Sequence, residues 1–214
     1  MKDIREQVKR RFDVDTKDHA MRVLHEDGLY RHLRFRSPDS SSYWFDIITW
    51  PGNLTINGDM GCYVFARTED MFEFFRADRR HGPRINPAYW QEKIRNEGSR
   101  KSSEKFDPAK FRSVIHQQVK DWLEDREPLT SEQYADLWRD INCEIFEHLN
   151  DWGDGQVAYD NACGFLWESD GRRFEFRDLF DYRYNDFTFH YIWNCYAIAH
   201  AIQAYDQANE KTAA

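Results

Sequence analysis

The 214-residue chain lacks any apolar run near the roughly 20 residues that a membrane-spanning helix needs. Its first residues, MKDIREQVKRRF, are charged and lack the apolar centre of a secretory signal peptide. Mean hydropathy is -0.88, but Trp, Tyr and Phe together number 35, so the charged residues indicate a polar surface rather than disorder. We therefore expect a soluble protein with no membrane association, located in the cytoplasm where it is made.

Cysteine is scarce, and its spacing is unsuited to metal binding. Cys62, Cys143, Cys163 and Cys195 lie far apart, and none belongs to a CxxC pair. This spacing argues against a zinc site of the usual kind, and the lack of an export signal favours reduced thiols. We expect four small, semi-buried side chains, no metal site and no cofactor.

Motifs of catalysis are also absent: there is no phosphate-binding loop, metal-ligand ladder or nucleophile motif. The segment Gly58-Asp59-Met60-Gly61 lacks the lysine of a nucleotide loop, so we interpret it as a turn in which Gly58 adopts a positive φ. Asp46 and Asp59 lie near the ends of predicted strands, where paired carboxylates can hold a catalytic metal. A histidine such as His32, on another predicted strand, could share that site. These three residues are the weak catalytic candidates, for a metal-dependent enzyme acting on nucleotides or nucleic acid.

The region from Leu29 to Ala66 is rich in strand signals. Alternating apolar residues predict strands over 29–36, 43–50, 53–57 and 62–66, with Leu33 and Phe35 inward and His32, Arg34 and Arg36 outward. Turn residues between these runs favour hairpins. Residues 1–27 are interpreted as helical, ending at Gly28. The pattern predicts an antiparallel sheet of three or four strands.

The remainder is mainly helical. Apolar residues at helical spacing predict a helix that Thr68 caps, a short one over 88–96, one after Asp107-Pro108, and one after the capping box Thr130/Gln133. A short helix to Phe165, a small strand over 173–176 and a long apolar helix from Asp186 follow.

The fold class that results is α+β, with an N-terminal antiparallel sheet of three or four strands packed on helices and a mainly helical C-terminal half. We expect a single domain over 1–214, because the final helix is too apolar to stand alone. A possible subdivision separates a sheet-containing part over 1–97 from a helical part over 106–214. The Ser- and Lys-rich stretch 97–105 is the linker candidate.

Three segments carry a family resemblance: GLYRHLRFR, FDIITWPGNLTINGDMGCYVFAR and DMFEFFR. They resemble an uncharacterised protein family of tailed bacteriophages and prophages, and the similarity extends over most of the chain, including INPAYW. The resemblance brings no activity and no catalytic residues. It implies a phage-borne accessory gene expressed in a bacterial host cell.

The net charge of −8 is unevenly distributed, since residues 121–186 carry 6 Lys/Arg against 18 Asp/Glu. A field of one sign attracts a basic partner and repels nucleic acid, so we expect a host protein as partner rather than direct nucleic-acid binding. The leading hypothesis is a non-enzymatic binding protein, such as an anti-defence inhibitor that mimics nucleic acid; a solvated acidic surface is the plainer alternative. The candidate partner-binding residues are Asp121, Glu124, Asp125, Glu127, Asp136, Asp140, Glu144 and Glu147.

One basic cluster and many tryptophans complete the sequence-based expectations. The cluster comprises Arg76, Arg79, Arg80, His81 and Arg84, and we expect it to dock on the acidic helical half instead of binding nucleic acid. Eight tryptophans are many for one domain, and any at the surface would mark a partner interface. A small-molecule sponge with an aromatic pocket is the third functional alternative.

Overall fold

The structure, a computed structural model, describes residues 4–77, 85–124, 126–149 and 155–213. The chain divides into two compact units. The sheet unit comprises Met1–Glu104 and Phe187–Ala214, and the helical unit comprises Lys105–Asp186. The helical unit is therefore inserted, in chain order, into the sheet unit.

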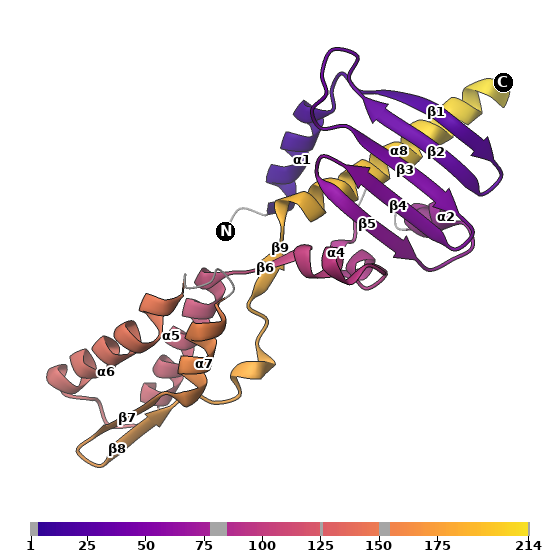
Figure 1. The fold of residues 1–214 in the computed structure, drawn as a ribbon. Helices are drawn as coiled ribbons and strands as arrows, with labels where there is room; N and C mark the ends of the chain where they lie inside the picture. Colours follow the sequence, from indigo (N-terminus) through magenta and orange to yellow (C-terminus); the bar gives the residue numbers. More distant parts are fainter. Residues whose placement is uncertain (1–3, 78–84, 125, 150–154, 214) are drawn as a thin grey trace. The chain divides into compact units, whose positions relative to one another are not determined.

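A five-stranded antiparallel sheet forms the centre of the sheet unit, with its strands ordered as in the sequence (Figure 1). The strand predictions over 29–36, 43–50, 53–57 and 62–66 are confirmed. The α+β class is confirmed as well, with the sheet in the N-terminal half and helices in the C-terminal half. The strands are β1 (Ala20–Asp27), β2 (Tyr30–Arg36), β3 (Phe45–Trp50), β4 (Asn53–Gly58) and β5 (Gly61–Ala66).

The sheet has five strands, not three or four, because β1 occupies residues that were predicted to be helical. Helix α1 (Ile4–Asp15) is followed by Thr16, whose hydroxyl donates to the Phe12 carbonyl at 2.8 Å. Gly28 then turns the β1–β2 hairpin with a φ of 59°. Asp-Gly is a strong hairpin signal, so Gly28 serves a turn and does not end a helix.

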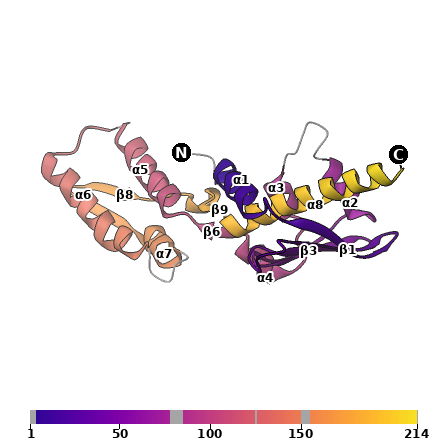
Figure 2. The same ribbon diagram turned by 90° about the horizontal axis from the view of Figure 1, so that it is seen from above.

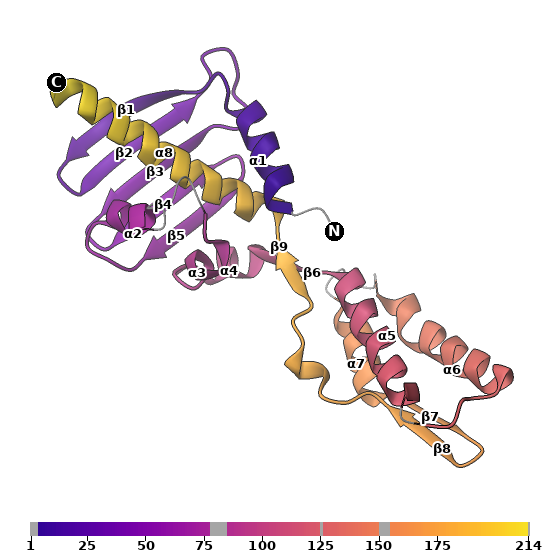
Figure 3. The same ribbon diagram turned by 180° about the vertical axis from the view of Figure 1, so that it is seen from behind.

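The long helix α8 (Phe189–Ala213) lies across one face of the sheet, as Figure 3 shows from behind. It begins after Thr188, whose hydroxyl accepts a hydrogen bond from the Tyr191 amide at 3.3 Å, three residues later than the predicted start at Asp186. Tyr191, Ile192 and Trp193 are consecutive, so they point to different sides of the helix, and all three are fully buried. The prediction of a central buried helix is confirmed.

The described part of the sheet unit also contains three short helices: α2 (Met71–Ala77), α3 (Pro87–Gln91) and α4 (Glu97–Ser102). Figure 2 shows α1, α2, α3 and α8 on the same side of the sheet. Asp70, not Thr68, caps α2 by accepting the Phe72 amide at 2.9 Å, and the same carboxylate binds Arg31 at 2.9 Å. This charged pair therefore anchors α2 to β2 beneath α8.

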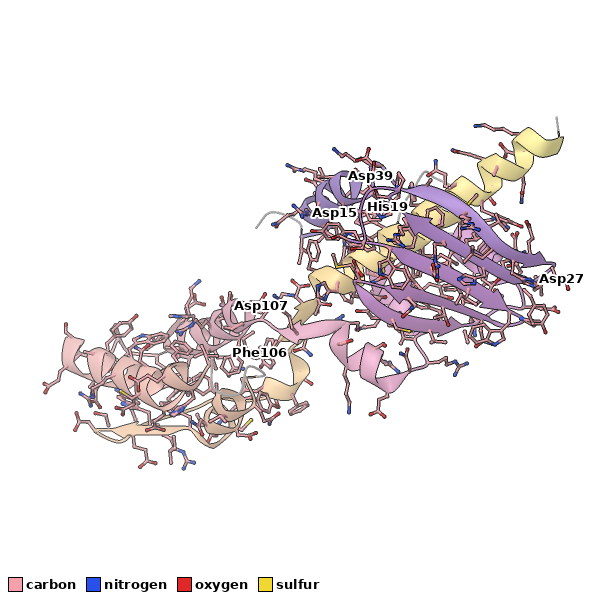
Figure 4. All side chains as sticks on the ribbon, turned by 45° about the horizontal axis from the view of Figure 1, so that its top comes forward. Asp15, His19, Asp27, Asp39, Phe106 and Asp107 are labelled. Carbon is pink, nitrogen blue, oxygen red and sulfur yellow. The ribbon has the colours of Figure 1, made fainter. Side chains whose placement is uncertain are left out.

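The helical unit has its own core, built from the apolar stripes of its two main helices. Phe111, Ile115 and Val119 are buried on one helix, and Leu137 and Ile141 on the other. Asp107, labelled in Figure 4, and Thr130 with Gln133 cap them as predicted. The elements are α5 (Pro108–Glu124), α6 (Ser131–Glu144), η1 (Phe146–His148), α7 (Gln156–Gly164), β7 (Leu166–Ser169), β8 (Arg172–Glu175) and η3 (Leu179–Asp181).

The unit boundaries differ from the predicted subdivision. The C-terminal helix belongs with the sheet and not with a part spanning 106–214. The range 97–105 holds α4 and the start of β6 (Glu104–Phe106), which pairs with β9 (Asn185–Phe187). The range 97–105 has the composition of a linker. However, Asn96, the residue just before it, accepts the Val64 amide on its Oδ1 at 3.1 Å, which ties the start of this segment to β5.

The turn between β4 and β5 shows a different use of glycine from the one predicted. Gly61, not Gly58, has the positive φ, at 100°. A Cβ on Gly58 would lie 2.2 Å from the Trp44 carbonyl oxygen, so this position needs glycine for close approach of β3. Asp59 accepts the Tyr43 amide at 2.5 Å, and Tyr43 itself has a φ of 61°.

Replacing Gly58 with alanine is expected to destabilise the protein by about 3 kcal/mol, because backbone atoms must move to admit the methyl group. Gly98→Ala is the matched control, since nothing lies within 4 Å of the added Cβ and its φ is not positive. Urea unfolding of both variants measures the difference. Equal free energies of unfolding in the two variants would contradict this account of Gly58.

Candidate functional site

The sheet has an inner face, packed against α8, and an opposite outer face toward which Figure 1 looks. The strand register places the outward residues in rows across the sheet. One row runs Arg22, Arg34, Asp46, Asn57 and Cys62 from β1 to β5. The next begins with His25 opposite His32. Three of the outward residues of β2, namely His32, Arg34 and Arg36, were predicted to point this way, and the pattern confirms it.

Two of the three weak catalytic candidates meet on this face. His32 Nε2 lies 3.0 Å from Asp46 Oδ2, and Arg34 donates to both carboxylate oxygens of Asp46, at 2.8 and 2.7 Å. The Asp46 side chain is only 6% exposed. Arg34 and His32 therefore hold a buried carboxylate whose two oxygens are both engaged.

The electrostatics of Asp46 follow from these contacts. Burial by itself raises the pKa of Asp46, but hydrogen bonds from Arg34 and His32 outweigh it and hold the pKa below its ordinary value of 3.8. A carboxylate of low pKa is a poor general acid or base near neutral pH. The Asp46 carboxylate is instead suited to fixing the orientation of the Arg34 and His32 side chains.

The third candidate, Asp59, is engaged elsewhere, on the Tyr43 amide at the β4–β5 turn. No interaction joins it to Asp46 or His32 among the described residues. In the described part of the chain, no three His, Cys, Asp or Glu side chains are grouped so that they would hold a metal ion.

The outer face also carries aromatic side chains at both ends of β3. The Arg34 guanidinium lies 5.8 Å from the centre of the Trp44 ring, and Arg34, Arg36, Ser41 and Trp44 line a recess of about 220 Å³. At the other end, Tyr30 is 54% exposed and Trp50 is 37% exposed. Arg22 and His25 were missed in the sequence, because β1 had been interpreted as helix.

The predicted partner-binding carboxylates that the structure describes lie on several elements, from the end of α5 to η1. Asp121 borders a recess that also holds Arg126, Arg173 and Arg177. Glu124 pairs with Lys120 at 3.4 Å, at the rim of a groove lined by Tyr134 and Trp138. Glu127 is exposed in the turn before α6, and Asp125 lies outside the described residues.

The remaining four form what we call the acidic stripe: Asp136, Asp140 and Glu144 on α6, and Glu147 on η1. The three α6 residues are four apart and so lie on one side of the helix. Arg139 pairs with Asp136 and Asp140, whereas Glu144 and Glu147 are exposed.

The basic cluster is only partly described. Arg76 pairs with Glu73 and with Asp206 of α8, so its partner belongs to the sheet unit and not to the acidic helical half. Arg79, Arg80, His81 and Arg84 lie outside the described residues.

The tryptophans and cysteines also differ in part from expectation. Trp90, Trp167 and Trp193 are buried, while Trp152 lies outside the described residues. The four cysteines form no disulfide; Cys195 is buried and the other three are exposed, not semi-buried.

Comparison of the chain with protein-family models, with curated proteins and with solved structures finds no match. Among the described helices, none combines the length and apolar character needed to cross a membrane.

Asp46→Asn is expected to lower the free energy of unfolding at pH 7 by about 2 kcal/mol, because charge-assisted hydrogen bonds from Arg34 and His32 are weakened. Since the folded-state pKa of Asp46 lies below 3.8, this stabilisation is complete above that pH and is lost as the pH falls through the folded-state value.

Urea unfolding of wild type and Asp46→Asn at pH 7, 5 and 3 tests this. The part of the difference in free energy of unfolding that comes from ionised Asp46 should be the same at pH 7 and pH 5. It should be smaller at pH 3. A difference that grows between pH 5 and pH 3 would mean that the folded-state pKa of Asp46 lies above its ordinary value, and would contradict this account.

Proposed function

We propose that the protein is a non-enzymatic binding protein that engages a partner protein with a basic surface through its helical unit. The observation that carries the proposal is the distribution of charge between the two units. The helical unit, Lys105–Asp186, contains 10 Lys/Arg and 19 Asp/Glu, whereas the sheet unit contains 20 and 19. The negative field thus belongs to one inserted unit, and a basic partner is steered to it.

The acidic stripe is the part of the helical unit best suited to that contact. Glu144 and Glu147 are exposed at the C-terminal end of α6 and on η1. Arg139 partly neutralises the N-terminal half of the stripe by pairing with Asp136 and Asp140. The strongest attraction for a basic partner therefore arises around Glu144 and Glu147.

The resemblance to phage proteins supports a host protein as the partner. Proteins that bind nucleic acid present basic surfaces, and exposed carboxylates that occupy such a surface exclude the phosphate backbone. An anti-defence inhibitor that mimics nucleic acid would act in this way. The two alternative functions, a metal-dependent enzyme and a small-molecule sponge, stay predictions, because no contact among the described residues supports either.

The double variant Glu144→Gln/Glu147→Gln is expected to weaken partner binding about tenfold, because two exposed charges each contribute of order 0.5–1 kcal/mol to a charged interface. The protein is first used to recover a stoichiometric partner from host lysate at physiological salt. Calorimetric titration of the purified partner then gives the affinities.

Glu168→Gln/Asp178→Asn is the matched control, since both residues are exposed in the same unit, neither lies on α6, and the change in net charge is equal. It should bind within about twofold of wild type at physiological salt, where charges beyond about 8 Å are largely screened. Failure to recover any stoichiometric partner, or equal losses in the two double variants, would overturn the proposal.

A further inference from the structure

We propose that the outer face of the sheet, over β1, β2 and β3, binds single-stranded nucleic acid. The proposal concerns the sheet unit only and is independent of the partner assigned to the helical unit. It revises the expectation against nucleic-acid binding, which rested on the net charge of the whole chain. That charge resides in the helical unit, and the sheet unit is close to neutral.

Three arginines gather on this face. Arg22 on β1 stands directly opposite Arg34 on β2, and Arg36 is the next outward residue of β2. Like charges opposite each other on neighbouring strands are unfavourable unless an anion lies between them. Asp46 neutralises Arg34, but no carboxylate among the described residues pairs with Arg22 or Arg36. Two cations are therefore left for an external anion.

The ion pair of Arg34 has a second consequence for the site. Asp46 holds the guanidinium through two hydrogen bonds, at 2.8 and 2.7 Å, and Arg34 still has 41% of its side chain exposed. A fixed and accessible guanidinium loses little rotamer entropy when it binds a phosphate. Asp46 therefore acts as a positioning residue for the arginine row.

Aromatic rings flank the arginines. Trp44 forms one wall of the recess that Arg34, Arg36 and Ser41 complete, and its volume of about 220 Å³ is below the roughly 300–1,000 Å³ of pockets that enclose a whole ligand. The recess suits one base stacked on the ring, with its phosphate at the arginines. Tyr30 and Trp50 are exposed on the same face at the other end of β3.

The distance between the aromatic side chains at the two ends of β3 favours an oligonucleotide as the ligand over a mononucleotide. Trp44 and Trp50 are six residues apart along β3, which corresponds to about 20 Å of extended chain. Arg36 is level with Trp44 in the register, and Arg34 and Arg22 are level with Asp46, so a bound polymer would place phosphates near the Trp44 end and bases on the rings at both ends. Stacking requires unpaired bases, because a duplex hides their faces.

The carboxylates of this face leave the Trp44 end open. Asp46 is buried beneath Arg34, whereas Asp27, labelled in Figure 4, stands opposite Tyr30 at the other end of the face. Helix α4 contacts β5, which is the edge strand opposite β1 in the sheet.

The test measures binding of fluorescein-labelled dT12 and rU12 to the full-length protein by fluorescence anisotropy in 50 mM salt. The expected result is binding that weakens with salt, with a slope of log Kd against log salt of about 1.4, as for two phosphate contacts, at Arg22 and Arg36, on a single strand. The duplex dA12·dT12 should bind at least tenfold more weakly.

Trp44→Ala is expected to weaken dT12 binding about tenfold, and Trp44→Phe to restore most of it. Arg22→Gln and Arg36→Gln should each lower the salt slope by about 0.7. Arg10→Gln, an exposed residue of α1 that makes a comparable loss of charge, is the matched control and should leave both values unchanged. Thermal unfolding by circular dichroism verifies that each variant is folded.

Four outcomes of the binding measurements would overturn the proposal, and a competition experiment gives a fifth. They are no binding by the wild type at 50 mM salt, equal binding of duplex and single strand, equal losses for Arg10→Gln and Arg22→Gln, and wild-type binding in Trp44→Ala. Polyglutamate of equal charge is added as a competitor. If it displaces dT12 at an equal concentration of charges, the face recognises an acidic protein surface and not nucleic acid.

Discussion

The packing of α8 against one face of the sheet is the constraint on which the rest of the sheet unit depends. A helix with buried side chains such as Tyr191, Ile192 and Trp193 on different sides cannot remain in water, and the inner face of the sheet supplies the apolar surface it needs. Because the C-terminal segment closes the unit that the N-terminal segment begins, everything between residues 105 and 186 is an insertion. The opposite face of the sheet keeps its polar and charged residues in contact with solvent.

The division into units also separates the charge. The helical unit holds all of the net negative charge, while the sheet unit holds arginines that its own carboxylates only partly neutralise. A basic protein and a nucleic acid would be drawn to different units of the same chain. Both binding proposals follow from this separation, and each depends on residues that the other does not use.

The fold could be predicted where local signals and burial agree. Alternation in β2 to β5, the caps at Asp107 and Thr130 and the apolar α8 were all predictable. β1 was not, because residues 1–27 are interpreted from the sequence as helical and Gly28 is compatible with a helix end as well as a hairpin. The unit boundary could not be predicted, since only packing in three dimensions shows that α8 contacts the sheet. The pairing of His32 with Asp46 required the register of β2 and β3, which the pattern of residues does not fix.

Native-state hydrogen exchange, resolved by residue, tests the central claim most directly. Amides of α8 and of β2 to β5 should exchange with a common free energy of opening and respond together to denaturant, because they form one cooperative unit. Amides of α5 and α6 should follow a separate transition. The account is contradicted if α8 opens together with α5 and α6 while the sheet remains protected.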